Sequence, residues 1–402
     1  MTQLRYLCGM DSSSRIYTSA FWLLCLSSFL FSTSFSMMIP ELPAYLTGLG
    51  GAEYKGLIIA LFTLMAGISR PFSGKLTDTI GRIPIMAFGS LVCFICGFLY
   101  PILTTVAGFL FLRFVHGFST GFKPTGTSAY IADIIPENRR GEALGLNGLT
   151  ANIGMSAGPP IGSWIADSFS LNAMFYVSSG FALLSIVILM NMKETLTEKQ
   201  RFSPTLLLLK KDELVERDAF QPAIVYFLTC IAYGAVFALA PDLSEHIGIH
   251  NKGLFFSAFT LSSLAVRFLA GKASDRWGRV IVVKWSLVFY TIAIVVIAFA
   301  HTPFMLMVGA AIFGVGLGMN SPAIFAWAID ISNEHNRGKA LATVYIALEA
   351  GIGCGSIFSV WLYDNNPTAF TKTFLISALF SVLGLGYLFF IERNHRTKTH
   401  VS

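Results

Sequence analysis

The sequence predicts an all-α membrane protein whose twelve transmembrane helices form two pseudo-symmetric six-helix bundles. Of its 402 residues, 54% are hydrophobic and only 12% are charged, whereas soluble domains carry about 25% charged residues. A helix needs about 20 mainly apolar residues to cross a bilayer, and the chain contains twelve such stretches. A repeat with an offset of 197 residues divides them into two sets of six.

A charged nine-residue stretch marks this repeat. Residues 74–82 (GKLTDTIGR) return as residues 271–279 (GKASDRWGR), which matches Gly74, Asp78, Gly81 and Arg82 with Gly271, Asp275, Gly278 and Arg279. The same offset relates Arg70 to Arg267, Asp133 to Asp330, and Gly154 and Gly158 to Gly351 and Gly355. Two related halves in parallel orientation are typical of secondary transporters, whose substrate site lies between the halves near the midplane.

The expected elements follow from the apolar stretches in order. The first half, residues 1–191, begins with a polar tail and has spans at about 18–40, 56–73, 84–103, 106–132, 142–166 and 172–191. A charged loop, residues 74–82, joins its second and third spans. Residues 192–219 hold six basic and six acidic residues and are the expected linker, in which Leu206–Leu209 could form a short surface helix. The second half, residues 220–402, has spans at about 221–240, 252–270, 281–300, 303–329, 339–362 and 372–391.

The net charge of +6 reflects membrane topology. Of the 28 lysines and arginines, 21 fall in the termini and the loops of one side, and three fall on the other side. Basic residues accumulate in cytoplasmic loops. We therefore expect both termini in the cytoplasm and no binding of nucleic acid, with the lipid bilayer as the chain's main surrounding.

Three motifs resemble those of the major facilitator superfamily. They are the G-x-x-x-D-x-x-G-R pattern of residues 74–82, Arg113 followed by Gly117, and residues 154–162 (GMSAGPPIG) with Gly154, Gly158, Pro159 and Gly162. Together they resemble the twelve-span drug:proton antiporters. That resemblance implies a monomeric efflux protein of the plasma membrane that needs no cofactor. Ser163 departs from the last motif, which usually closes with a second glycine.

The repeated stretch has an expected mechanical role. Charges at the edge of a membrane are costly unless they are paired, so we expect Asp78 and Arg82 to bind neighbouring helix ends and the aspartates Asp133 and Asp330. The resemblance implies a latch that stabilises the outward-open state. In the fifth span, Gly154, Gly158 and Gly162 share one face, which predicts close helix packing, while Pro159 favours a bend.

Glu349 is the sharpest candidate for proton coupling. It lies near the middle of an expected span, and its counterpart in the first half is Asn152. Carboxyl groups in a low-dielectric environment hold a proton more readily than in water, and ionisable residues deep in a membrane are rare without a function. The alternative is a structural ion pair or a solvated residue that faces a cavity.

A polar face on the fourth span is the second candidate. Its residues follow at spacings of three and four, which places them on one side of a helix: Arg113, His116, Thr120, Lys123, Thr127 and Tyr130. Such a face would line the cavity and favour an anionic substrate, or its basic groups would neutralise Glu349 or Glu41. Asn320 is a further polar candidate, and Glu41 is either a gate or, as we favour, a residue of the outer rim.

These features favour proton-coupled export of small amphiphilic compounds by alternating access. The same machinery running as a symporter, or carrying an anionic metabolite, is the alternative. The sequence contains no paired nucleophile and base, metal-ligand cluster or phosphate-binding loop after a strand, so we expect neither an enzyme nor a metal or cofactor site.

Overall fold

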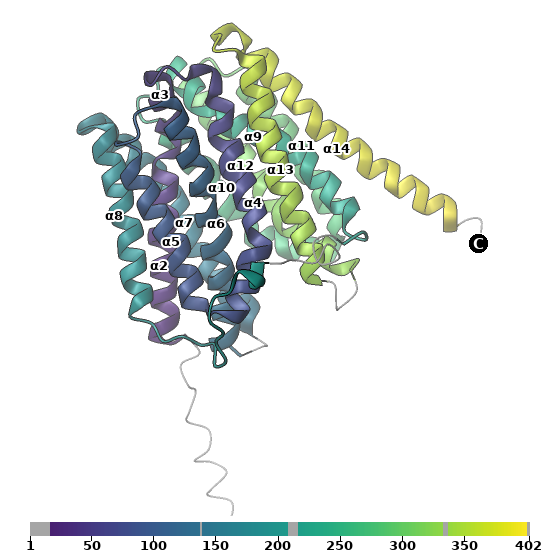
Figure 1. The fold of residues 1–402 in the computed structure, drawn as a ribbon. Coiled ribbons are helices and arrows are strands. Elements are labelled where there is room, and N and C mark those ends of the chain that lie inside the picture. Colours follow the sequence, from purple (N-terminus) through teal and green to yellow (C-terminus); the bar gives the residue numbers. More distant parts are fainter. Residues whose placement is uncertain (1–16, 137–138, 208–215, 333–336, 400–402) are drawn as a thin grey trace, which may run out of the picture.

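The computed structural model describes residues 17–136, 139–207, 216–332 and 337–399, and every regular element within them is helical. The first half supplies α2 (Ser19–Met37), α4 (Lys55–Thr79), α5 (Arg82–Leu99), α6 (Val106–Ile134), α7 (Arg140–Ser168) and α8 (Leu171–Met190). The second half supplies α9 (Phe220–His246), α10 (Gly253–Trp277), α11 (Arg279–Ala298), α12 (Pro303–Asp330), α13 (Arg337–Tyr363) and α14 (Phe370–Thr399). The two sets lie side by side, with α4 next to α13 at their junction (Figure 1).

These long helices match the twelve predicted stretches closely in position. Nine of the helices in the described part of the chain are long and apolar enough to cross a membrane, and α10 is a tenth if its two bent parts form one span. The first of the nine joins α2 to the short α3 (Leu42–Gly48) through the 3₁₀ turn Ile39–Glu41. Helices α6 and α7 fall short of this test, so the count of twelve crossings stays a prediction.

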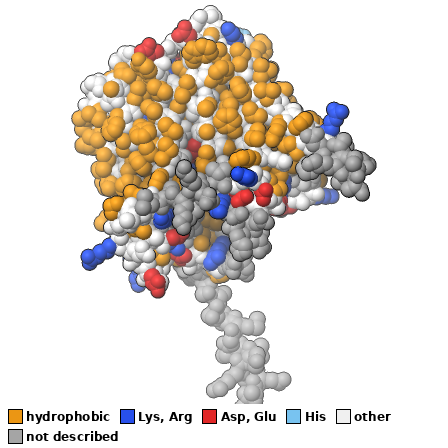
Figure 2. Space-filling view, turned by 45° about the vertical axis from the view of Figure 1, so that its right-hand side comes forward, with side chains coloured by type: hydrophobic (Ala, Val, Ile, Leu, Met, Phe, Trp, Pro, Cys, Tyr) orange, Lys and Arg blue, Asp and Glu red, His pale blue; other side chains and the backbone are white. Residues whose placement is uncertain are grey.

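The exterior fits a bilayer. Large apolar side chains such as Leu64, Phe111 and Trp361 are exposed on the helices, and in Figure 2 hydrophobic side chains cover most of the visible face while charged ones gather toward its ends. Exposed apolar surface of this extent is favourable only in contact with lipid or another protein. The chain is therefore a multi-pass membrane protein.

The repeated charged stretch is more helical than the sequence predicted. Instead of a loop over residues 74–82, α4 continues to Thr79, and only Ile80 and Gly81 connect it to α5. The helix continues because charged side chains that leave the apolar layer are solvated and need not end a helix. Gly81 has φ +139°, a conformation that favours glycine, and a Cβ there would lie 2.5 Å from Glu194 Oε2.

The linker contributes to this connection. Both carboxyl oxygens of Glu194 accept hydrogen bonds at the start of α5, from the backbone N–H groups of Arg82 and Ile83, each at 3.0 Å. The short helix expected at Leu206–Leu209 is a 3₁₀ turn, Pro204–Leu207. Leu208 and Leu209 lie outside the described residues, as does the N-terminal tail up to residue 16.

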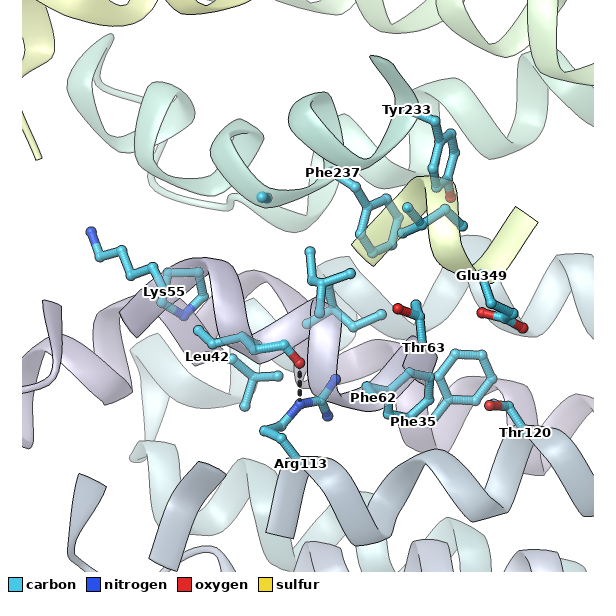
Figure 3. A pocket seen from close by; sticks show the side chains of 16 residues that line it. Phe35, Leu42, Lys55, Phe62, Thr63, Arg113, Thr120, Tyr233, Phe237 and Glu349 are labelled. Atoms are coloured by element: carbon cyan, nitrogen blue, oxygen red, sulfur yellow. Dashed lines mark hydrogen bonds between the residues drawn. The ribbon is translucent and has the colours of Figure 1, made fainter. Parts of the chain in front are cut away.

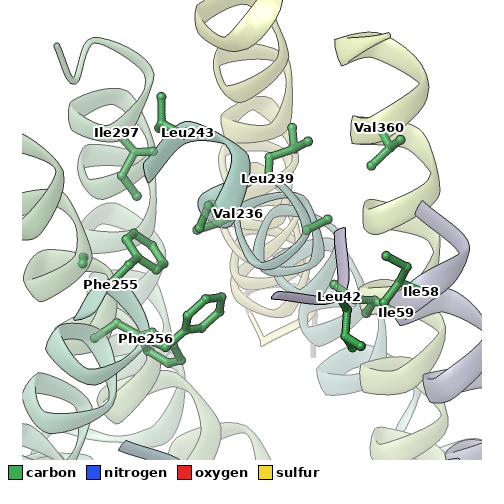
Figure 4. Close-up of a cluster of buried hydrophobic side chains, with 14 of the residues drawn as sticks. Leu42, Ile58, Ile59, Val236, Leu239, Leu243, Phe255, Phe256, Ile297 and Val360 are labelled. Carbon is green, nitrogen blue, oxygen red and sulfur yellow. The ribbon is translucent and has the colours of Figure 1, made fainter. Parts of the chain in front are cut away.

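The apolar core shows how the halves meet. We call the end that carries residues 74–82 and 271–279 the motif end, and the opposite end the far end. Toward the far end, one continuous cluster joins both halves and includes Leu42, Ile58, Val236, Leu239 and Val360 (Figure 4). Toward the motif end, the halves have separate clusters, one around Phe21 and Tyr130 and another around Tyr226 and Trp327. The halves are thus packed together at the far end.

Candidate functional site

A cavity of about 170 Å³ lies between the two halves. Helices α2, α4 and α6 line it from the first half, and α9 and α13 from the second (Figure 3). Its wall is mostly apolar and includes the aromatic rings of Phe35, Phe62 and Phe237. A few polar side chains also line it: Lys55, Thr63, Arg113, Thr120, Tyr233 and Glu349. Concave, mainly apolar sites with a few placed polar groups are typical of small-molecule binding.

Glu349 faces this cavity and also connects the two halves. Its side chain on α13 is 10% exposed, and Oε1 accepts a hydrogen bond of 3.0 Å from Nη2 of Arg70 on α4. The Arg70 guanidinium lies 4.3 Å from the centre of the Tyr345 ring, which also belongs to α13. Removing one partner of a largely buried ion pair is destabilising, so the charged state of Glu349 ties α13 to α4.

Arg113 is, with Glu349 and Lys55, one of three charged groups among the described residues of the cavity wall. Its Nε donates to the carbonyl oxygen of Ile58 at 2.9 Å, and its guanidinium lies 4.6 Å from the centre of the Phe62 ring (Figure 3). Its Nη1 lies 3.4 Å from the hydroxyl oxygen of Tyr100. Within the described part of the chain, no carboxylate forms an ion pair with Arg113.

The structure divides the predicted polar face of α6. Arg113 and Thr120 reach the cavity, but His116 and Lys123 are buried inside the first half and are not among the residues that line it. His116 lies between the Tyr100 hydroxyl and Cys93 Sγ, 3.2 and 3.3 Å from its ring nitrogens. The reason is geometric, because a step of three residues falls about 60° short of a full helical turn.

Further along α6, Lys123 and Tyr130 also point away from the cavity. Lys123 Nζ donates to Ser27 Oγ on α2 at 2.9 Å, so it neutralises neither Glu349 nor Glu41. The hydroxyl of Tyr130 donates to the carbonyl oxygen of Lys193 at 2.9 Å, near the motif end.

The two predicted asparagines also lie away from the cavity wall. Asn320 is fully buried within the second half, where its Nδ2 donates to Ser286 Oγ on α11 at 2.7 Å. Asn152, the counterpart of Glu349, is half-buried on α7.

Two ion pairs join the halves at the far end. Lys55 at the start of α4 binds Asp242 on α9, with 2.5 Å between Nζ and Oδ2. Glu41 is 5% exposed, accepts a hydrogen bond of 2.6 Å from Ser163 Oγ, and lies 3.6 Å from Lys252 Nζ. Glu41 is therefore enclosed between the halves, and the expectation of an exposed rim residue is wrong.

Lys252 stays charged in this position. Burial lowers the pKa of its ammonium group, but Glu41, Glu245 and Asp242 outweigh that effect and raise the pKa above its usual value. An ammonium group surrounded by three carboxylates is a stable link between the halves at neutral pH.

At the motif end the predicted charges form clusters within each half. Arg82 binds Asp78 at 2.8 Å and Asp133 at 3.0 Å, all in the first half. Arg279 binds Asp275 and Asp330 in the same way in the second half. Arg82 has its expected partner Asp133, but Asp330, also expected to pair with the first stretch, binds Arg279 instead. These two clusters do not join the halves in this conformation. The Asp78 carboxyl is 72% exposed and available to another partner.

The glycine face of α7 packs against α2. A Cβ on Gly158 would lie 2.8 Å from the carbonyl oxygen of Thr33, and one on Gly162 would lie 1.9 Å from that of Met37. Pro159, by contrast, contacts the second half, because a Cβ on Gly253 of α10 would lie 2.2 Å from its carbonyl carbon. The glycines therefore form a packing surface, and Pro159 lies at the contact between the halves.

Sequence reasoning missed the partners that tie the halves together: Arg70, Lys55, Asp242 and Lys252. A signal for Arg70 was present, because it recurs as Arg267 four residues upstream of the repeated stretch. Nothing in the sequence indicated that its partner would be Glu349, which lies 279 positions away.

Comparison with known proteins agrees with this architecture. The family model for the Major Facilitator Superfamily matches residues 24–219 and 222–402. The multidrug resistance protein MdtG of Serratia proteamaculans (strain 568) is 31% identical over 325 residues, which cover 75% of this chain and 76% of MdtG. The quinolone resistance protein NorA of Staphylococcus aureus (strain MSSA476) is 25% identical over 390 residues, which cover 92% of this chain and 95% of NorA.

Solved transporters share the fold at low sequence identity. The human organic anion transporter MFSD10 (TETRAN) superposes with a TM-score of 0.70 at 16% identity, covering 92% of this chain and 98% of that one. A POT family transporter bound to a thioalcohol-conjugated peptide superposes with a TM-score of 0.77 at 13% identity, covering 93% and 96%. The family match over both halves and the transporter relatives lead to one assignment: this chain belongs to the Major Facilitator Superfamily of transporters.

Proposed function

We propose that this protein exports small amphiphilic or drug-like compounds in exchange for protons by alternating access. The observation that carries the proposal is the Arg70–Glu349 pair, which joins the halves and whose carboxylate lies in the wall of the cavity. A proton on Glu349 removes the negative charge that holds Arg70, so protonation and the contact between the halves are linked. The names of MdtG and NorA support drug-like cargo for this chain.

The conformation described here represents one end of the transport cycle. The halves are joined at the far end by Lys55–Asp242 and Glu41–Lys252. We assign the motif end to the cytoplasm because basic residues accumulate there, so this state is closed toward the outside. In the opposite state, the exposed Asp78 would leave its local pair with Arg82 and join the halves at the cytoplasmic end as a latch.

Several further assignments belong to the same proposal. The protein resides in the plasma membrane as a monomer with both termini in the cytoplasm. Residues 1–191 and 220–402 act as two rigid bundles joined by the linker 192–219. Gly154, Gly158 and Gly162 keep α7 packed against α2. Pro159 contacts the second half, which moves relative to the first during transport.

Proton release from everted membrane vesicles tests the proposal. Respiration acidifies the vesicle lumen, and an exporter in this orientation carries added substrate inward while protons leave. We expect ethidium or norfloxacin to reverse the quenching of a pH-sensitive dye in vesicles that contain the protein, and not in vesicles that lack it. Transport of these compounds without proton movement would contradict the coupling.

Arg113 favours anionic compounds as a second class of substrate. It lies in the cavity wall with a backbone carbonyl and an aromatic ring as its neighbours, and an arginine in such a setting favours a carboxylate-bearing or otherwise anionic compound. The same vesicle assay with a panel of organic anions tests this alternative. Proton release by anions but not by cationic dyes would replace the drug-like cargo with an anionic metabolite.

A further inference from the structure

A second, larger space lies between α4 and α13 on the outside of the molecule. This lateral groove has a volume of about 620 Å³ and an almost wholly apolar lining. Leu64, Ile68, Ile346 and Ile357 form its rim, and each is at least 40% exposed on the surface that faces the bilayer. The residues along α4 run from Leu57 to Phe72, about 22 Å of helix at 1.5 Å per residue. The groove therefore opens into the hydrocarbon layer.

Only a thin wall separates the lateral groove from the central cavity. Thr63 and Glu349 line both spaces. Glycines bring the two helices together here: a Cβ on Gly353 would lie 3.0 Å from Thr63 Oγ1, and one on Gly67 would lie 3.3 Å from Glu349 Cβ. A rotamer change at Thr63 or Glu349, or a small separation of α4 from α13, would connect the two spaces.

The carboxylate of Glu349 in this wall determines which class of compound the groove would bind. Among the described residues that line the groove, Glu349 is the only acidic or basic one, and its partner Arg70 lines neither space. A hydrocarbon chain gains no hydrophobic free energy by moving from lipid into an apolar groove, so the groove offers access rather than affinity. A carboxylate is scarce at this depth, and it distinguishes a cationic compound from the surrounding lipid.

We infer that the lateral groove is an entrance through which cationic amphiphiles dissolved in the bilayer reach Glu349 and the central cavity. The inference rests on the proposed export function and adds the route by which cargo enters. Loss of the Arg70 contact would let Glu349 receive the cationic group, while the apolar part of the compound stays between α4 and α13.

Photolabelling of the purified protein in nanodiscs tests the groove directly. The probe is an alkyltrimethylammonium ion with a twelve-carbon chain and a diazirine at its end. We expect peptides from residues 57–72 and 346–357 to carry the label. The variant Ala350→Phe, at an exposed groove residue, fills the space without entering the core and should lower labelling by about tenfold. The matched control Leu183→Phe, on the lipid-facing surface of α8, should not.

Four results would overturn the inference. They are label spread evenly over the lipid-facing helices, unchanged labelling in Ala350→Phe, equal labelling by an alkylsulfonate of the same chain length, and occupation by a diazirine-bearing phosphatidylcholine that excludes the cation. Transport measured in vesicles distinguishes failure of the lateral entrance from failure of the proposed export function. If vesicles transport ethidium but Ala350→Phe and wild type take up the membrane-dissolved cation at equal rates, the entrance is wrong and export stands. If wild type transports no tested compound, export fails whatever the labelling shows.

Discussion

Replacing Glu349 with glutamine tests the link between proton binding and the contact between the halves. Glutamine keeps the size of the side chain and an acceptor oxygen for Arg70, but it removes the charge and the proton-binding group. The carboxylate–guanidinium bond is 3.0 Å long, with side chains 10% and 23% exposed. Hydrogen bonds to charged groups contribute about 1.5–3 kcal/mol and neutral ones about 1 kcal/mol. The difference between the two is about 0.5–2 kcal/mol, and the partial exposure of Arg70 favours a loss of about 1 kcal/mol, or about fivefold in an equilibrium constant.

Hydrogen exchange at the far end measures how much Glu349→Gln weakens the contact between the halves. Amide exchange in segments 41–56 and 242–254 reports how often the far end opens. We expect about fivefold faster exchange there in Glu349→Gln, normal expression, and no substrate-induced proton release in everted vesicles. Glu53→Gln, an exposed far-end substitution, is the matched control and should change neither readout. Unchanged exchange together with wild-type proton release in Glu349→Gln would refute the reasoning.

Three further predictions, two substitutions and one pH dependence, address the latch, the helix contact and the far-end link. Asp78→Asn should lower turnover about fivefold or more, with little change in substrate affinity, because the latch acts on the conformational equilibrium. Gly162→Ala should lower the unfolding free energy by about 1–3 kcal/mol, because its Cβ would lie 1.9 Å from a backbone oxygen of α2. The raised pKa of Lys252 predicts that its link to Glu41 persists below pH 10.5 and is lost as the pH rises through the folded-state pKa.

Each of these three predictions can be checked by a measurement whose opposite result would contradict it. Transport kinetics beside equilibrium binding separate turnover from affinity, and a defect confined to affinity in Asp78→Asn would count against the latch. Thermal unfolding tests the glycine contact, with Gly180→Ala as a control at a site with open space, and equal stability of both variants would contradict it. Far-end hydrogen exchange, corrected for its intrinsic pH dependence, should rise above pH 10.5 only when Lys252 is present. The same rise in Lys252→Gln would assign it to another group.

The sequence alone determined the features that depend on local composition and spacing. Apolar stretches of membrane-spanning length located the helices to within a few residues at most ends, since burial in lipid demands an apolar, internally hydrogen-bonded segment. The 197-residue repeat set the two-part organisation, and the position of Glu349 in an apolar stretch marked it as costly to bury. Local charge misled at both copies of the repeat, where residues 74–79 continue α4 and residues 271–277 continue α10 instead of forming loops.

Only the tertiary structure decided which groups meet. Arg113 and Lys123 share a helix and a charge, yet one lines the cavity and the other is buried against Ser27, because a few tens of degrees of helix rotation select the neighbour. The pairing of Glu349 with Arg70, and of Glu41 with Lys252, depends on how the halves dock. Contacts between residues far apart in the chain arise from the packing of whole helices, and no local pattern in the sequence records that packing.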